Sequence, residues 1–442
     1  MKKLICSIML SAAIATGAGS GAWYADQEDP SQFNKQLFYS NEAVVRGADP
    51  STIWVSEEEH AEDGGYFYSY VTGSSTINAY RSNNLSDWQY LGGVFRPNLD
   101  VSWAYMNYWA PSVRYDAESG KYLMFYSACW KAKRSYNGMS GLNRFYLSLA
   151  VSDSPAGPFV EYTDDNKGEN EPLIDFANIP KESPLFEEYV EGAYENGYLS
   201  AIDAESFLDP VTGKKYLLFC HDKAGAYSAS TIWIMEMENW TTPCYDKITP
   251  LTENGVTMIG GTEEIEEGTV NEGPFMYYRN GTYYLTFSVY TYNMSQYQVR
   301  QAVASSPTGP FRKIAYEDGG AVLTTDGLGV YTNSSGHASI IDVDGEPYIS
   351  YHTFLNDEDL SQSRKLRFDK ISIVPNSEGI EVMCANGPPV TPQYLPEGVS
   401  GYRNIASEAY VSVRKMQEGS DAFWLTDGTL KATPFRLWKR SN

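Results

Sequence analysis

The chain has 442 residues and a formal net charge of −23, with 35 tyrosines, 37 glycines and 22 prolines. A field of that sign repels nucleic acids, anionic lipids and polyanionic substrates, which leaves neutral substrates as the favoured class. The sequence has no long apolar stripe with a period of 3.6 residues, and it is long enough to bury a substantial core. We therefore predict an all-β protein with a small appendage.

Residues 1–22 have the pattern of a signal peptide. Two lysines at positions 2 and 3 precede an apolar run over residues 4–15, and SGA at 20–22 offers a small-residue cleavage site. This run is too short to cross a bilayer, and no later apolar stretch is long enough. We expect export to a secreted or periplasmic location, and no membrane span.

Four cysteines would remain in the exported chain, namely Cys129, Cys220, Cys244 and Cys384. They are scattered and show no CxxC spacing, which argues against zinc or redox chemistry. A single disulfide, such as Cys220 with Cys244, is left open, because spacing alone does not decide a pairing.

An aromatic hairpin recurs five times. Its best-defined copy is VNEGPFMYYRNGTYYLTFSVY, residues 270–290, in which two strand-like segments flank a tight Asn-Gly turn. In each copy an apolar residue stands four positions after a leading residue, and the chain then returns through a Tyr-rich segment. The leading residues are Asp49, Trp109, Asp203, Glu272 and His337.

We interpret the five copies as the blades of a five-bladed β-propeller over residues 36–385. In a propeller the innermost strands surround a central axis, so the starts of these strands converge at one mouth of the channel. The arrangement predicts that three carboxylates, an indole and an imidazole share one pocket.

Three other segments differ in composition from the hairpins. Residues 163–198 are acidic and rich in glycine, asparagine and proline, which predicts a surface insertion over or beside the pocket mouth. Residues 386–403 have the composition of a linker. Residues 404–442 resemble the start of a galactose-binding-like β-sandwich but are too few to close its core; a tail that packs on the propeller or stays disordered is the alternative.

Seven short signatures follow one another along the propeller region: GADP, SNNLSDW, YWAPSV, AIDAESFLD, NEGPFMYYRNGTYYLTFS, SGHASII and SRKLRF. As an ordered set they resemble family 43 of the glycoside hydrolases, which are five-bladed propeller enzymes acting on arabinose- and xylose-containing polysaccharides. The resemblance covers roughly residues 40–375. It implies a neutral plant cell-wall polysaccharide or oligosaccharide as substrate and an α-L-arabinofuranosidase, β-xylosidase or arabinanase activity.

The resemblance also assigns catalytic roles to the three carboxylates. Asp49 matches the family's general base, Glu272 its general acid, and Asp203 the carboxylate that positions the acid and tunes its pKa. Ala204 is a departure, because proline usually follows this aspartate, and it leaves the backbone setting of Asp203 less certain.

Three further positions match binding residues of the family. Trp109 would form a wall of the sugar subsite, and Arg364 matches a sugar-binding arginine. His337 matches an axial histidine that lies beside a calcium or other ion in many members, so a structural calcium ion near His337 is an optional expectation. No cofactor is required.

The chemistry of glycoside hydrolysis explains this set of residue types. One protonated carboxyl donates to the leaving oxygen, while an ionised carboxylate activates water on the opposite face of the sugar. Repulsion from Asp203 would raise the pKa of Glu272 and keep it protonated near neutral pH. We expect inversion, with about 6.5 to 9.5 Å between the carboxyl groups of Asp49 and Glu272.

Each candidate also has a structural interpretation. Asp49 precedes a proline and Glu272 a glycine, so the former could be a turn residue and the latter a solvated strand end. Trp109 could pack between blades, and His337 could be a hydrogen-bonded structural histidine.

Two further residues, Arg367 and His352, are alternative or additional candidates for the pocket. Arg367 competes with Arg364, and strand alternation allows only one of the two to face the pocket. His352 could face the pocket or pack within its blade.

Two other functions fit parts of the pattern. A non-catalytic carbohydrate-binding propeller would keep Trp109 and Arg364 but would tolerate loss of an acid, and all three acids are present. A retaining fructan hydrolase typically has an NDPNG start where this chain has GADPST. Whether the enzyme acts as an exo-glycosidase or as an endo-acting arabinanase is left open.

Overall fold

The computed structural model describes residues 38–39, 41, 45–131, 145–163, 171–183, 185–186, 201–222, 230–252, 267–268, 270–323, 332–355, 364–385, 393–396 and 399. The expected signal peptide and the expected C-terminal module lie outside these residues and stay predictions. No helix in this part of the chain is both long and apolar enough to cross a membrane.

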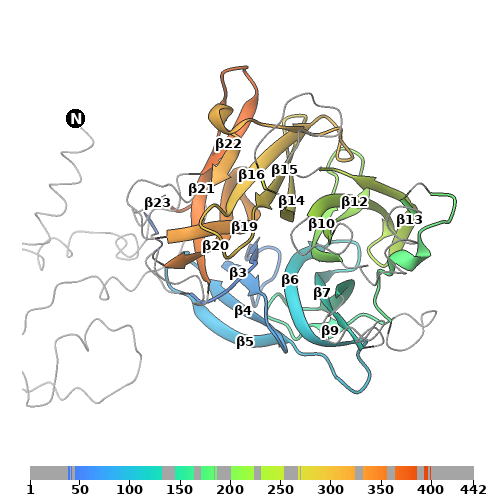
Figure 1. The fold of residues 1–442 in the computed structure, drawn as a ribbon. Coiled ribbons are helices and arrows are strands. Elements are labelled where there is room, and N and C mark those ends of the chain that lie inside the picture. Colours follow the sequence, from blue (N-terminus) through green and yellow to red (C-terminus); the bar gives the residue numbers. More distant parts are fainter. Residues whose placement is uncertain are drawn as a thin grey trace, which may run out of the picture. The chain divides into compact units, whose positions relative to one another are not determined.

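Five antiparallel sheets surround a common centre and confirm the predicted five-bladed β-propeller (Figure 1). Each sheet is built from consecutive strands, so each blade is one stretch of chain. The blades, in order, are β2 (Ser51–Val55), β3 (Tyr66–Val71), β4 (Ile77–Ser82) and β5 (Gln89–Phe95); β6 (Ala104–Asp116), β7 (Lys121–Trp130), β8 (Phe145–Ser152) and β9 (Val160–Glu161); β10 (Ala201–Leu208), β11 (Lys215–Asp222), β12 (Ser230–Asn239) and β13 (Thr242–Pro250); β14 (Asn271–Arg279), β15 (Thr282–Val289), β16 (Gln298–Ala304), β17 (Arg312–Lys313) and β18 (Ala321–Leu323); and β19 (Thr332–Val343), β20 (Glu346–Leu355), β21 (Lys365–Pro375) and β22 (Glu381–Ala385).

The inner strands form a closed ring. β2 contacts β6, β6 contacts β10, β10 contacts β14, β14 contacts β19, and β19 contacts β2. The chain just before β2 completes the closure, because the Leu366 N–H donates to the Val45 carbonyl at 2.9 Å and the Gly47 N–H to the Arg364 carbonyl at 3.0 Å. Blade one is thereby joined to blade five by backbone hydrogen bonds.

Serine side chains connect neighbouring inner strands. An inner strand has a free edge toward the channel, and its buried N–H groups need acceptors. In three blades a serine hydroxyl two or three positions after the leading residue accepts such an N–H from the next blade. These pairs are Ser51 with the Val113 N–H at 2.9 Å, Ser112 with the Ser206 N–H at 3.1 Å, and Ser339 with the Thr52 N–H at 3.1 Å.

The hydrophobic core consists of five clusters, one between each pair of adjacent blades. Both faces of a middle strand are therefore buried, which explains why segments such as KYLMFYSACW in β7 are apolar at successive positions rather than alternating. Tyrosines suit these layers because the ring fills the gap while the hydroxyl reaches a polar partner. The Tyr70 hydroxyl, for example, donates to the Pro155 carbonyl in blade two at 2.6 Å.

The described residues of two expected connections pack against or pair with other parts of the chain. Within the expected linker, β23 (Gln393–Tyr394) pairs with β1 (Phe38–Tyr39), so this piece of the linker is a paired strand rather than a free connection. Within the expected insertion, the 3-10 helix η3 (Phe176–Asn178) packs between blades two and three, where the Phe176 ring lies 6.3 Å from that of His221. A second 3-10 helix, η5 (Tyr316–Asp318), precedes β18.

Cys129, Cys220, Cys244 and Cys384 form no disulfide in the structure. Cys220 is buried in the interface between blades three and four, and its thiol faces the Asn271 carbonyl at 3.5 Å. The disulfide left open between Cys220 and Cys244 is therefore absent from the structure.

Candidate functional site

Each blade has a left-handed residue at its predicted leading residue or one position after it. These residues are Asp49 (φ 51°), Ala110 (φ 44°), Asp203 (φ 59°), Gly273 (φ 57°) and His337 (φ 49°). In β6, β10, β14 and β19 the ladder register shifts at the same place. Such bulges turn side chains out of the ladder, and positive φ values are uncommon for residues other than glycine. Each blade therefore has a segment around its leading residue in which the backbone departs from regular strand geometry.

The left-handed residue coincides with the predicted leading residue in blades one, three and five. In blades two and four it lies one position later, at Ala110 rather than Trp109 and at Gly273 rather than Glu272. A side chain at Gly273 would collide with His337, because an added Cβ would lie 2.9 Å from the His337 Cγ. Glycine is required there both for its conformation and for this close approach.

Asp49 is 9% exposed and lies in a dense polar network. The Arg364 guanidinium donates to its Oδ1 at 2.8 Å, and the Thr72 hydroxyl donates to its Oδ2 at 2.6 Å. Its backbone N–H donates to Nδ1 of His352 at 3.2 Å, and Nδ1 of His337 lies 3.3 Å from its Oδ1.

The environment of Asp49 favours its ionised form. Burial alone would raise its pKa, but the positive charge of Arg364, together with the contacts of His337 and His352, outweighs burial and holds the pKa well below the ordinary value. Asp49 is therefore a carboxylate at neutral pH.

Glu272 and Asp203 occupy neighbouring blades and interact. The Tyr297 hydroxyl donates to Oε1 of Glu272 at 2.8 Å, and the Gly273 N–H donates to Oδ2 of Asp203 at 3.0 Å. Burial, followed by repulsion from Asp203, raises the pKa of Glu272 to about 8. Glu272 therefore retains a proton at neutral pH, where Asp49 has none.

His337 lies between two of the three carboxylates. Its Nδ1 is 3.3 Å from Oδ1 of Asp49 and 3.8 Å from Oδ2 of Asp203, and its backbone N–H donates to the Ser288 hydroxyl at 2.7 Å. Burial lowers the pKa of its imidazole. The structure thus brings Asp49, Asp203, Glu272 and His337 into one site.

The expected calcium ion would need oxygen ligands close to His337. Calcium prefers six to eight oxygen ligands. In the part of the chain that the structure describes, no group of three or more histidine, cysteine, aspartate or glutamate side chains is placed to hold a metal ion. An ion beside His337 stays a prediction, and no step proposed below depends on it.

Arg364 reaches the site, whereas Arg367 does not. The Arg364 guanidinium binds Asp49 and covers the ring of Tyr292 at 4.6 Å. Arg367 is 3% exposed, its guanidinium donates to the Leu366 carbonyl at 2.9 Å, and its charge faces Asp369. The two arginines thus face different surroundings, as strand alternation predicts.

Trp109 is half-buried and stacks on Phe145, with 4.3 Å between ring centroids and 26° between planes. It is linked to the carboxylate site through its neighbour Ala110, whose N–H donates to the Thr72 hydroxyl at 2.9 Å while that hydroxyl donates to Asp49. Trp109 therefore packs on a neighbouring ring and also lies beside the site.

Four residues of the site were not assigned a role by the sequence. The sequence does not decide whether His352 faces the pocket or packs in its blade, and in the structure it contacts Asp49. Thr72, Tyr292 and Tyr297 follow hairpin strands but occupy no shared repeat position, and nothing distinguishes the two tyrosines from the other tyrosines of the chain.

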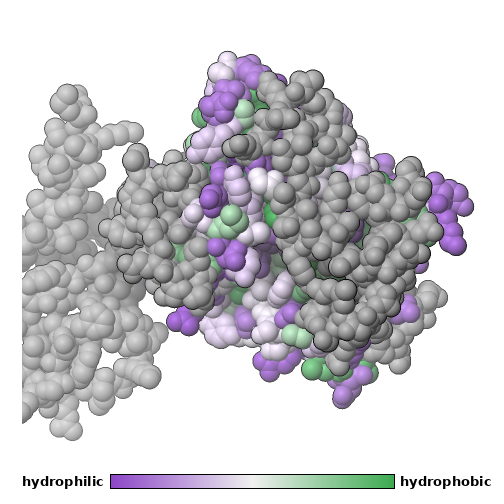
Figure 2. Space-filling view, in the orientation of Figure 1, coloured by the Kyte–Doolittle hydropathy of each residue, from purple (hydrophilic) through white to green (hydrophobic). Residues whose placement is uncertain are grey.

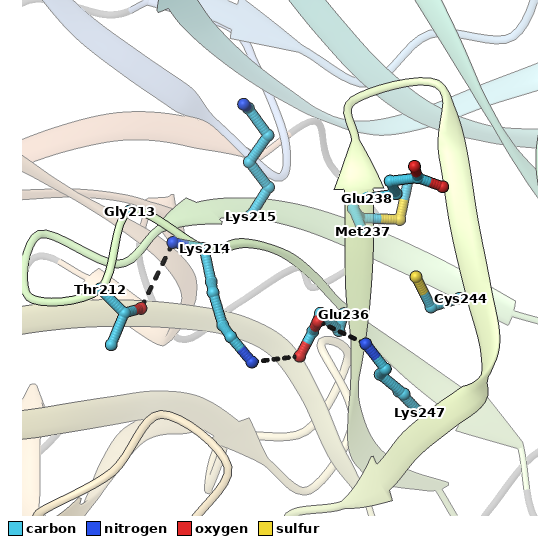
Figure 3. Close-up of a pocket in the computed structure, with 9 residues that line it drawn as sticks. All are labelled: Thr212, Gly213, Lys214, Lys215, Glu236, Met237, Glu238, Cys244 and Lys247. Atoms are coloured by element: carbon cyan, nitrogen blue, oxygen red, sulfur yellow. Dashed lines mark hydrogen bonds and ion pairs between the residues drawn. The ribbon is translucent and has the colours of Figure 1, made fainter.

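A concavity lies on the outer part of blade three. It is a pocket of about 380 Å³ lined by Thr212, Gly213, Lys214, Lys215, Glu236, Met237, Glu238, Cys244 and Lys247 (Figure 3). Glu236 accepts from Lys214 at 2.8 Å and from Lys247 at 2.7 Å, so its charge is already compensated. The pocket contains none of the predicted site residues. The propeller face in Figure 2 is coloured mostly hydrophilic to intermediate between the grey atoms.

Comparison with known proteins identifies the family. The sequence model of "Glycosyl hydrolases family 43" matches residues 46–182 and 186–377. "Probable arabinan endo-1,5-alpha-L-arabinosidase D" of Emericella nidulans is 27% identical over 335 residues, which is 72% of this chain and 74% of that protein. "Beta-D-galactofuranosidase xynD" of Aspergillus niger is 32% identical over 180 residues, which is 40% of this chain and 44% of that protein.

A solved structure agrees at the level of the fold. The crystal structure of a thermostable family-43 glycoside hydrolase superimposes with a TM-score of 0.57 at 24% identity, and it covers 83% of this chain and 99% of that one. The family match spans most of the propeller and confirms the resemblance seen in the ordered signatures. The chain therefore belongs to glycosyl hydrolases family 43 and is a glycosidase.

Proposed function

We propose that the protein is an exported glycosidase that cleaves arabinose- or xylose-containing plant polysaccharides or oligosaccharides with inversion. Asp49 acts as the general base, Glu272 as the general acid, and Asp203 raises the pKa of that acid. The observation that carries the proposal is the opposite direction of two pKa shifts in one site: the pKa of Asp49 is lowered and that of Glu272 is raised. Inverting hydrolysis needs one carboxyl group in each protonation state.

The contacts of Glu272 support its role as the acid. Its Oε1 accepts a hydrogen bond from Tyr297, so the transferable proton belongs on Oε2, the other carboxyl oxygen. Oε2 would deliver the proton to the leaving oxygen as the glycosidic bond breaks. Asp203 lies beside Glu272 and makes its neutral form more favourable until that transfer.

The contacts of Asp49 support its role as the base. Arg364 and Thr72 each donate to one of its oxygens, which fixes the orientation of the carboxylate. An oxygen held in this way can accept a proton from a water that attacks the anomeric carbon. The positive charge of Arg364 keeps Asp49 ionised, although it also weakens Asp49 as a base.

The side chains around the carboxylates would bind the sugar. Trp109 offers an aromatic ring beside the site, and Arg364 offers donors next to Asp49. We add Tyr292, which is 46% exposed and lies beneath the Arg364 guanidinium. Aromatic faces suit the apolar faces of sugar rings, so a neutral carbohydrate fits this surface.

Arabinose-containing substrates rank first within the proposal. The relative that shares the longer match is named an arabinan endo-1,5-α-L-arabinosidase, and the second relative is named a β-D-galactofuranosidase. The choice between exo- and endo-action depends on loops around the mouth and is decided by product size.

A substrate panel tests the proposal. The purified full-length chain is assayed on nitrophenyl α-L-arabinofuranoside, nitrophenyl β-D-xyloside, nitrophenyl β-D-galactofuranoside, linear arabinan and galactan. We expect turnover of the arabinofuranoside, of arabinan, or of both, with monosaccharide release marking exo-action and oligosaccharides marking endo-action. Binding of arabinan without turnover of any substrate would instead support the non-catalytic carbohydrate-binding propeller.

A further inference from the structure

A buried aromatic pair lies between the proposed acid and the proposed base. Tyr297 immediately precedes β16 and His352 belongs to β20, and both side chains are 0% exposed. Their rings stack with 5.7 Å between centroids and 13° between planes. Tyr297 donates to Glu272, and His352 accepts from the backbone of Asp49. The pair therefore touches both carboxyl-bearing residues.

We infer that Tyr297 and His352 form a positioning unit that fixes the acid and the base relative to each other. The inference rests on the proposed function and deepens it. Tyr297 selects which oxygen of Glu272 carries the proton, while His352 anchors the strained backbone at Asp49. Neither residue touches the reacting atoms through the contacts described, so both act through the carboxyl groups.

The surroundings of Tyr297 are shaped to hold its ring. Gly336 lies against it, and an added Cβ at Gly336 would lie 2.1 Å from the Tyr297 Cε1. A backbone this close leaves the ring little freedom to rotate away from Glu272. The Ser288 hydroxyl, which accepts from the His337 N–H, also hydrogen-bonds the Tyr297 phenol. Tyr297 is therefore held from blades four and five at once.

The tautomer of His352 follows from its contact with Asp49. Because Nδ1 accepts the Asp49 N–H, the hydrogen of the neutral ring is on Nε2, a buried atom with no hydrogen-bond partner among the described residues. Burial, followed by the charge of Arg364, lowers the pKa of His352 to about 3, so the ring stays neutral across the working range. His352 thus serves Asp49 as a hydrogen-bond acceptor at a residue whose φ of 51° needs such support.

The two halves of the unit predict different kinetic effects. Without the phenol, Glu272 can rotate, its proton can lie on either oxygen, and the carboxylate formed by proton transfer loses a donor. That loss affects substrates that need protonation of the leaving group. A change at His352 instead disturbs Asp49, which acts on water whatever the leaving group is.

Tyr297→Phe tests the first half. We expect kcat/KM on linear arabinan, or on another unactivated substrate identified by the panel, to fall by roughly 10- to 100-fold. On a nitrophenyl glycoside with a good leaving group, the loss should be less than about threefold, because such a group departs without full protonation. The basic limb of the pH profile should move to higher pH, since Glu272 loses a hydrogen bond that stabilises its ionised form.

Tyr283→Phe is the matched control for Tyr297→Phe. Tyr283 is also a buried tyrosine of blade four, and its hydroxyl donates to a carboxylate, Oδ1 of Asp209, at 2.7 Å. Removing that hydroxyl should leave the pH profile and the dependence on leaving group unchanged.

His352→Asn and His352→Leu test the second half. Asparagine can place an acceptor near the position of Nδ1, whereas leucine cannot. We expect His352→Leu to lose activity on activated and unactivated substrates alike, and His352→Asn to recover part of it. Circular dichroism and thermal melting show which variants are folded.

Two results would overturn the inference. One is a folded Tyr297→Phe enzyme with wild-type kcat/KM on the unactivated substrate and a wild-type basic limb. The other is equal activity of His352→Leu and His352→Asn. Failure of the proposed function is a separate outcome, because the wild-type protein would then hydrolyse none of the panel.

Discussion

Replacing Glu272 with glutamine is expected to lower kcat/KM on linear arabinan, or on another unactivated substrate of the panel, by about 10²- to 10⁴-fold. Glutamine has nearly the same shape and can still accept the Tyr297 hydrogen bond, but it has no proton to donate. A nitrophenyl substrate with a good leaving group should retain much more of its turnover. Steady-state kinetics on the two kinds of substrate measure this difference.

The pH profile gives a second measure of the same group. Glu272 acts in its protonated form, so kcat/KM of the wild-type enzyme on an unactivated substrate should fall as pH rises through about 8, where this carboxyl loses its proton. The Glu272→Gln variant should lack that basic limb. Unchanged turnover in this variant, with the limb intact, would remove Glu272 from the role of acid.

Replacing Asp49 with asparagine is expected to lower turnover of every substrate by about 10²- to 10⁴-fold, activated nitrophenyl glycosides included. The base acts on water, so a better leaving group does not restore the lost activity. Asparagine keeps the size of the side chain, and its amide oxygen can still accept from Arg364, whereas its NH2 group replaces the oxygen that accepts from Thr72. The substitution therefore removes the negative charge and one of the two hydrogen bonds. Initial rates on an activated and an unactivated substrate measure the effect.

Asp209→Asn serves as the control for this substitution. Asp209 is also buried, but it accepts from Tyr283 and Thr212, away from the candidate site. Its substitution should affect thermal stability more than it affects turnover. A folded Asp49→Asn enzyme with activity within a few-fold of wild type would exclude Asp49 as the base.

The repeat made the fold and the three carboxylates predictable from sequence. A five-fold recurrence of one hairpin fixes which residues start the inner strands, and a propeller brings those starts together. Asp49, Asp203 and Glu272 are far apart in the chain, but the contacts of His337 and Gly273 link them. Because side chains alternate along a strand, only one of Arg364 and Arg367 can face the pocket. Arg364 is the one that binds Asp49.

The supporting residues were not predictable in the same way. Tyr297 reaches Glu272 only because Gly336, on another blade, leaves room for its ring. His352 sits in a middle strand, where side chains of either face are buried, so periodicity does not distinguish a core histidine from one that holds Asp49. These roles depend on packing between blades, which a local sequence pattern does not encode.

The left-handed backbone positions are another feature that the sequence repeat does not reveal. The repeat places Trp109 and Glu272 at the leading position of blades two and four, but the left-handed residue there is the next one, Ala110 or Gly273. A Gly-Pro or Ala-Pro dipeptide can signal such a position only when the turn is already known. Because of this offset, the side chains of Trp109 and Glu272 belong to the residue just before the left-handed one, whereas Asp49, Asp203 and His337 are themselves left-handed.

The anomeric configuration of the first-formed sugar tests the central claim most directly. Proton NMR of the wild-type reaction, recorded before mutarotation, follows the new anomeric proton on whichever substrate the panel shows to be cleaved. Attack by a water that Asp49 activates, with Glu272 protonating the leaving oxygen, predicts a product of inverted configuration. A product that retains the configuration of the substrate would contradict this division of roles between Asp49 and Glu272.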